Sequence, residues 1–169
     1  VMYQETDVGG RTEFTNTDYN GQPLPSLEQP YIVEVPFPDD SLILNLTGEY
    51  RTDLGSFTAT ASLFDRETTF NDDASFALSA LTGGAFPLTG SGRSVFRQAK
   101  DRELNSFELR FASDWDFPIQ ALVGVFHQRE DRFVRVSIPT TDANGEVAAN
   151  PSIYLDRTVD TEIDETAVF

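Results

Sequence analysis

Apolar and charged side chains alternate strictly along part of this sequence. Phe107, Leu109 and Phe111 point to one side of an extended chain, and Glu108 and Arg110 point to the other. A period of two is the pattern of a β-strand with one apolar and one polar face. A soluble sheet with one wet face satisfies this pattern, and so does the wall of a membrane barrel.

The same alternation recurs along the chain, and helical periodicity is nearly absent. Residues 42–50 and 56–70 form one expected hairpin, with the short turn signal RTDLG at 51–55 between them. A second hairpin joins 95–112 to 119–135 through the turn DWDFP at 114–118. With the partial strands at the two ends of the chain, we expect an all-β fold of about six antiparallel up-and-down strands.

The expected connections alternate between long and short. Long polar segments occupy about 17–40, 71–94 and 136–155, whereas the turns at 51–55 and 114–118 are brief. In an up-and-down sheet all long connections leave from one end and all short turns from the other. This asymmetry is typical of outer-membrane barrels, which have short periplasmic turns and long outer loops.

Composition narrows the classes of partner. The formal net charge of −16 argues against nucleic-acid binding, which needs a basic surface. There is no cysteine, so disulfides and thiolate metal sites are excluded. No apolar run reaches the length of a membrane helix. The sequence opens and closes in the middle of strand-like patterns, so we expect 1–169 to be one piece of a longer protein.

The residues give no sign of catalysis. His127 is the only histidine, and the chain has no G-x-S-x-G motif to pair with it, so we interpret His127 as an ordinary wall residue. The acidic stretch at 142–146 lacks calcium-loop spacing, and the glycine-rich stretch at 82–92 lacks the Gly-Lys-Ser/Thr of a phosphate loop. We therefore predict no enzyme activity, no cofactor and no bound metal.

Three segments resemble the barrel strands of TonB-dependent outer-membrane receptors. They are SLFDRETTFNDD at 62–73, SFELRFASDWDFPIQALVGVFHQREDR at 106–132 and DTEIDETAVF at 160–169. The resemblance implies a partial transmembrane β-barrel of a protein with about 22 strands, without its plug domain and without its C-terminal strand. It also implies a location in the outer membrane of a Gram-negative cell.

The family resemblance further implies a function in transport. The parent protein would take up a small-molecule ligand such as a ferric siderophore, a cobalamin or an oligosaccharide, without catalysis. Its partners would be outer-membrane lipid and the TonB complex, the latter contacted through parts of the parent protein that are absent here.

This interpretation assigns roles to individual residues. The ligand-contact candidates are aromatic or cationic residues of the expected outer loops: Phe86, Arg93 and Tyr154. Residues opposite the apolar side of their strands are expected to face the lumen: Arg66, Glu108 and Arg110. The two aromatic residues of the turn are expected at the inner membrane interface: Trp115 and Phe117.

A second interpretation is a soluble β-sandwich module of the carbohydrate-binding or adhesion type. It accounts equally well for the alternation and for the acidity. It accounts less well for the regular succession of long and short connections.

Overall fold

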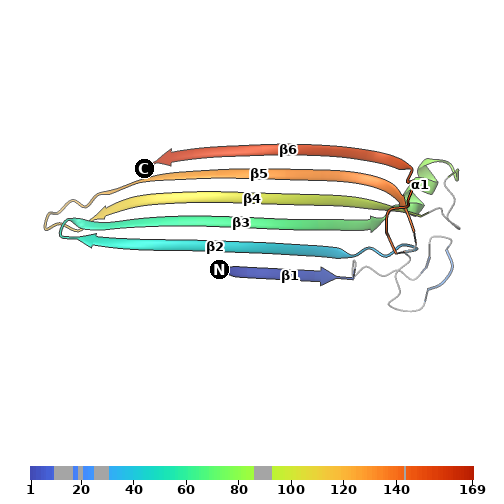
Figure 1. Cartoon of the computed structure of the whole chain (residues 1–169), viewed down its shortest axis with the longest axis horizontal. Coiled ribbons are helices and arrows are strands. Elements are labelled where there is room, and N and C mark those ends of the chain that lie inside the picture. Colours follow the sequence, from blue (N-terminus) through green and yellow to red (C-terminus); the bar gives the residue numbers. More distant parts are fainter. Residues whose placement is uncertain (10–16, 19–20, 25–30, 86–92, 143) are drawn as a thin grey trace.

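The chain forms one antiparallel sheet whose strands lie side by side in sequence order (Figure 1). The computed structural model describes residues 1–9, 17–18, 21–24, 31–85, 93–142 and 144–169. The strands are β1 (Met2–Val8), β2 (Phe37–Thr52), β3 (Gly55–Asp73), β4 (Arg93–Ser113), β5 (Leu122–Thr141) and β6 (Ile153–Val168), and one short helix is α1 (Ser75–Leu81). The prediction of an all-β fold built from antiparallel hairpins is confirmed.

Both short turns lie at one end of the sheet, and the longer connections lie at the other (Figure 1). The β2–β3 loop consists of Asp53 and Leu54 alone, since Thr52 pairs directly with Gly55. Gly55 has a φ of +146°, and a Cβ there would lie 2.2 Å from the backbone oxygen of Ala112. Glycine is therefore required both by the turn and by the close approach of β4.

Strands β2 to β6 run further than the alternation predicts, so the connections at 74–92 and 142–152 are shorter than expected, whereas the connection at 9–36 is longer than the expected 17–40. The structure continues β3 to Asp73 and β5 to Thr141, and it begins β2 at Phe37 and β6 at Ile153. These portions lie at the end of the sheet with the long connections, called here the upper end; the end with the short turns is the lower end. In the upper portions both faces carry polar side chains, which removes the alternation that marks a strand. The backbone ladder nevertheless continues through them.

The helix α1 was not predicted. It spans seven residues and has no side-chain hydrogen bond at its N-cap, so neither periodicity nor a capping signal marks it in the sequence. Within the described ranges no helix is long and apolar enough to cross a membrane.

The buried core is small and lies at the end of the sheet with the long connections. Its apolar members among the described residues are Val33, Val35, Ala74, Leu78 and Val95. The remainder of the described sheet is a single layer, so most side chains of its lower half are exposed on one face or the other.

Candidate functional site

One face of the lower sheet is a continuous apolar surface, called here the belt. The strand register places its rows directly opposite one another, so that Ala61 faces both Leu46 and Phe107, and Leu109 faces both Ala59 and Val125. Its members are Leu44, Leu46, Gly48, Tyr50, Phe57, Ala59, Ala61, Leu63, Phe107, Leu109, Phe111, Val123 and Val125. Many of the large side chains are exposed, Leu46 at 75%.

The belt has a definite height. Its rows from Leu44 to Tyr50 cover about 20 Å along the strand, at about 3.4 Å per residue. The turns below extend this apolar surface, because Leu54, Phe117 and Ile119 are each at least 60% exposed. An outer-membrane barrel carries an apolar band about 25 Å tall.

Trp115 and Phe117 lie in the β4–β5 turn at the lower edge of the belt. The sequence predicts a turn at these residues. The turn is held by side-chain contacts: the Trp115 Nε1 donates to the Ile119 carbonyl at 2.6 Å, and the Gln120 amide donates to the carbonyls of Trp115 and Phe117. Their location at a membrane interface stays a prediction.

The structure explains part of the apolar arm at 119–126, although Leu122 and Phe126 lie on the face opposite the belt, across from Ala112 and Glu108. Ile119 and Ala121 belong to the turn, because β5 begins only at Leu122. Val123 and Val125 lie on the belt, whereas Gly124 lies on the other face and exchanges backbone hydrogen bonds with Phe169 of 2.8 and 3.1 Å.

The opposite face of the sheet, called here the polar face, carries hydroxyl, amide and charged side chains, together with an apolar row of Ile43, Phe64 and Leu104. Arg66, Glu108 and Arg110 all lie on it, as the alternation predicts. Arg110 is 3.9 Å from Glu108, two residues away on the same strand, and Arg66 pairs with Asp39 of β2. The three side chains thus share one face; that this face lines a lumen stays a prediction.

Arginines from three strands form a row across the polar face. Arg66 of β3 is opposite Arg102 of β4, which is opposite Arg132 of β5. Glu130 is 4% exposed and accepts hydrogen bonds from both Arg102 and Arg132. Sequence reasoning missed Arg102 and Arg132, because a row of side chains exists only once the strand register is known.

These ion pairs lower the pKa values of the two carboxylates. The hydrogen bond from Arg66 lowers the pKa of Asp39, and the hydrogen bond from Arg132, assisted by Arg102, lowers the pKa of Glu130. Arg66 holds Asp39 in a bidentate pair, with Nε–Oδ1 at 2.9 Å and Nη2–Oδ2 at 2.5 Å.

Above the belt, on the same face of the sheet, the side chains are mainly acidic. Asp65, Glu103, Asp131 and Glu162 stand in one row across β3 to β6. The next row up begins with Glu5, Asp40, Glu67 and Asp101 on β1 to β4. Like charges directly opposite each other are destabilising. In the described chain, no group of three or more acidic or histidine side chains is arranged to hold a metal ion.

His127 lies on the belt face at its upper edge. Its Nδ1 is 3.0 Å from the Thr166 hydroxyl and 3.9 Å from an oxygen of Asp164. Together with Leu44, Leu63 and Phe107, His127 lines a shallow groove of about 690 Å³. These surroundings fit the interpretation of His127 as a wall residue.

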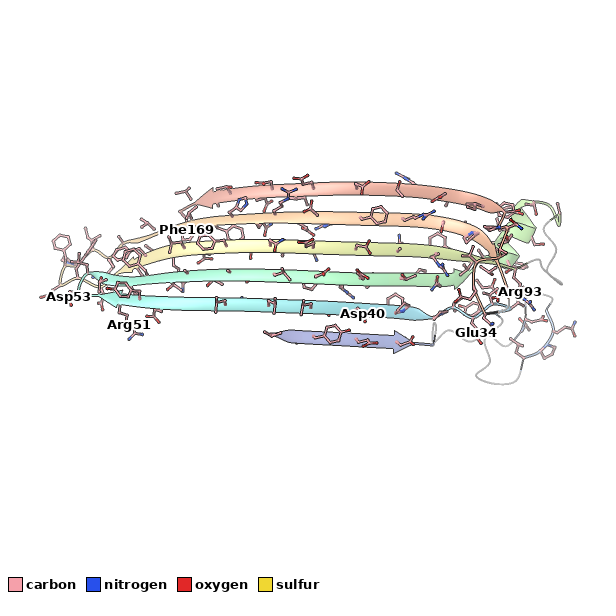
Figure 2. All side chains as sticks on the ribbon, in the orientation of Figure 1. Glu34, Asp40, Arg51, Asp53, Arg93 and Phe169 are labelled. Carbon is pink, nitrogen blue, oxygen red and sulfur yellow. The ribbon has the colours of Figure 1, made fainter. Side chains whose placement is uncertain are left out.

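Two of the three ligand-contact candidates, Arg93 and Tyr154, lie at the end of the sheet with the long connections. Figure 2 shows Arg93 there beside the segment that carries Glu34, at the end opposite Asp53. Arg93 begins β4 opposite Thr141 and is partly buried, and Tyr154, near the start of β6, is 48% exposed. The two residues share this end but lie on strands separated by β5. Phe86 lies outside the described residues.

The connections at this end pack against one another. The Asn71 amide donates to the Pro36 carbonyl at 2.6 Å, and the Arg97 Nε donates to the Asn71 Oδ1 at 3.1 Å. Gly145, with a φ of +78°, approaches so closely that a Cβ there would lie 2.6 Å from the Glu34 oxygen. In the acidic stretch at 142–146, the Asp142 carboxylate accepts hydrogen bonds from the backbone N–H groups of residues 144 and 146.

Comparisons of this chain with protein families, with characterised proteins and with solved structures find no match.

Proposed function

We propose that this chain forms part of the wall of an outer-membrane β-barrel of the TonB-dependent receptor type. Its parent protein would take up a small ligand such as a ferric siderophore, a cobalamin or an oligosaccharide, without catalysis. The proposal of uptake, of the TonB complex as partner and of the outer membrane as location rests on the resemblance of three sequence segments to that family.

The observation that carries the proposal is the belt on a single-layer sheet. Exposed apolar patches larger than a few hundred Å² mark interaction or membrane surfaces. The belt crosses four strands, and the described chain offers no second layer to cover it. In a barrel wall, lipid covers the belt and the lumen contents meet the polar face.

The edges of the sheet support the same proposal. In the described part of the chain, β1 and β6 each pair on one side only, and β1 covers β2 only as far down as Ile43. Long unpaired edges invite aggregation, and inside a bilayer they are not tolerated. A closed barrel supplies a neighbour for both edges. A β-sandwich instead requires a second sheet packed about 10 Å away over the apolar face.

Cell fractionation tests the proposal. The natural protein is expected in the outer-membrane fraction, soluble only in detergent, and its folded form is expected to migrate differently from its boiled form on a gel. A protein that stays soluble without detergent and shows no such shift would refute the barrel.

A pair of neighbouring substitutions sharpens this test. Ala59→Arg places a charge on the belt, where a lipid-facing arginine costs about 2–4 kcal/mol near the bilayer midplane. Thr60→Arg places the same charge on the polar face. The folded, heat-modifiable form is expected to be lost with Ala59→Arg and retained with Thr60→Arg; equal effects of the two would contradict the proposed orientation.

A further inference from the structure

The arginine row of the polar face concentrates positive charge. Neighbouring strands lie about 4.8 Å apart, so the Cα atoms of Arg66, Arg102 and Arg132 span about 10 Å. Lys100 stands in the adjacent row on the same face, next to Arg102 along β4. Like charges directly opposite each other cost stability, so this arrangement favours an anion that bridges them.

The carboxylates on this face neutralise the row only in part. Asp39 pairs with Arg66, while Glu130 is shared between Arg102 and Arg132. Two carboxylates therefore face three guanidinium groups and the ammonium group of Lys100. Glu130 is buried beneath its partners, whereas the three arginine side chains remain 45–46% exposed.

Donor groups also remain available. The contacts to Asp39 and Glu130 engage the Nε and one Nη of Arg66 and of Arg132, and the Nε of Arg102. Each guanidinium has five N–H donors, so these contacts leave several donors of each arginine unused. Arg102 is also stacked over the Phe64 ring, with its Cζ 5.5 Å from the ring centroid, which orients the guanidinium plane.

We propose that Arg66, Arg102 and Arg132 form a subsite for an anion with two or more carboxylate or phosphate groups. Arginine forks bind the paired oxygens of such groups in a planar, bidentate geometry. The row length matches a ligand whose anionic groups lie several ångströms apart. Resting on the proposed barrel function, the inference places an anionic ligand class on the lumen side of the wall.

The binding experiment uses the natural protein, purified from whichever cell fraction contains it, with citrate and pyrophosphate as probes in calorimetric titrations. We expect the wild-type protein to bind at least one of them, with an affinity that falls as the salt concentration rises. Binding of citrate alone identifies a polycarboxylate ligand, and binding of pyrophosphate alone identifies a phosphate ligand.

Arg66→Gln and Arg102→Gln are each expected to weaken binding about tenfold or more, the loss of a charge-assisted contact. Glu130 keeps Arg132 as a partner in both variants. Arg102→Lys serves in place of Arg102→Gln if the glutamine variant does not fold. It retains the charge but not the planar fork of donors, and it is expected to bind the probe more weakly than wild type.

Arg135→Gln is the matched control, because Arg135 makes an equally bidentate pair with Asp156 but lies on the belt face. It should bind the probe like wild type. Failure of the wild-type protein to bind either probe, or unchanged binding in the Arg66 and Arg102 variants, would overturn the subsite. Fractionation tests the barrel separately, so a membrane protein without anion binding refutes only this inference.

Discussion

Gly55 fixes the turn of the β2–β3 hairpin. A methyl group at this position would meet the backbone of β4, which cannot move aside without disturbing the sheet. We expect Gly55→Ala to lower the free energy of unfolding by about 1–3 kcal/mol, through overpacking and an unfavourable positive φ. Urea unfolding in detergent micelles measures the change.

Gly48→Ala is the control for Gly55→Ala, because no atom lies within 4 Å of the added Cβ at Gly48. Its unfolding midpoint should stay close to that of the wild-type protein. A midpoint lowered as much by Gly48→Ala as by Gly55→Ala would contradict the role given to the β2–β3 turn.

The ion pairs of the polar face predict an acid-sensitive stability. Because the folded pKa values of Asp39 and Glu130 are lowered, these groups stabilise the fold fully above their unfolded values of about 3.9 and 4.3. This contribution is lost as the pH falls through the lower, folded values. The unfolding midpoint should therefore drop as the pH is lowered from about 5, and it should drop less in Asp39→Asn; equal slopes would contradict this assignment.

At the residue scale, alternation alone places Arg66, Glu108 and Arg110 on the face opposite the belt. It does not place Arg102 and Arg132 beside Arg66. A long connection joins the strands of Arg66 and Arg102, and Arg102 and Arg132 lie far from the short turn between their strands. Only the register between the strands, set by backbone pairing, aligns the three arginines. The sequence contains the three arginines, but no local pattern in it predicts that they form a row.

At the scale of elements, the two hairpins and their turns are predictable, because their lower halves alternate and their turn residues are distinctive. The upper strand ends are not, because polar side chains on both faces interrupt the alternation there, although Phe70 contacts the rings of Phe37 and Phe96 at this end. The short helix α1 has fewer than two helical turns and leaves no period to detect.

The β4–β5 turn carries its own probe, since Trp115 is the only tryptophan of the chain. If this turn lies at a membrane interface, its fluorescence should be quenched by brominated lipids in reconstituted vesicles. Bromine near the headgroup should quench more strongly than bromine at the end of the acyl chain. Absence of quenching by either lipid would remove Trp115 from the interface.

For the whole molecule, the question is what stabilises a single-layer sheet whose apolar face is exposed. The lower sheet gains little from burial within the described chain, because its belt is exposed and the small core lies at the other end. The backbone ladder holds the strands together, but hairpins without a covered apolar face are marginal in water. Under the proposed barrel, lipid covers the belt and supplies this stabilisation.

The central claim is that lipid covers the belt and not the polar face, and site-directed labels test it directly, because residues 1–169 contain no cysteine. Single-cysteine variants at Phe107, Glu108, Leu109 and Arg110 are spin-labelled in the natural protein, reconstituted into lipid vesicles. Accessibility to oxygen, which concentrates in the bilayer, is compared with accessibility to a water-soluble nickel complex. We predict that Phe107→Cys and Leu109→Cys favour oxygen, and that Glu108→Cys and Arg110→Cys favour nickel, with a period of two. Four labels that all favour the nickel complex would contradict the account.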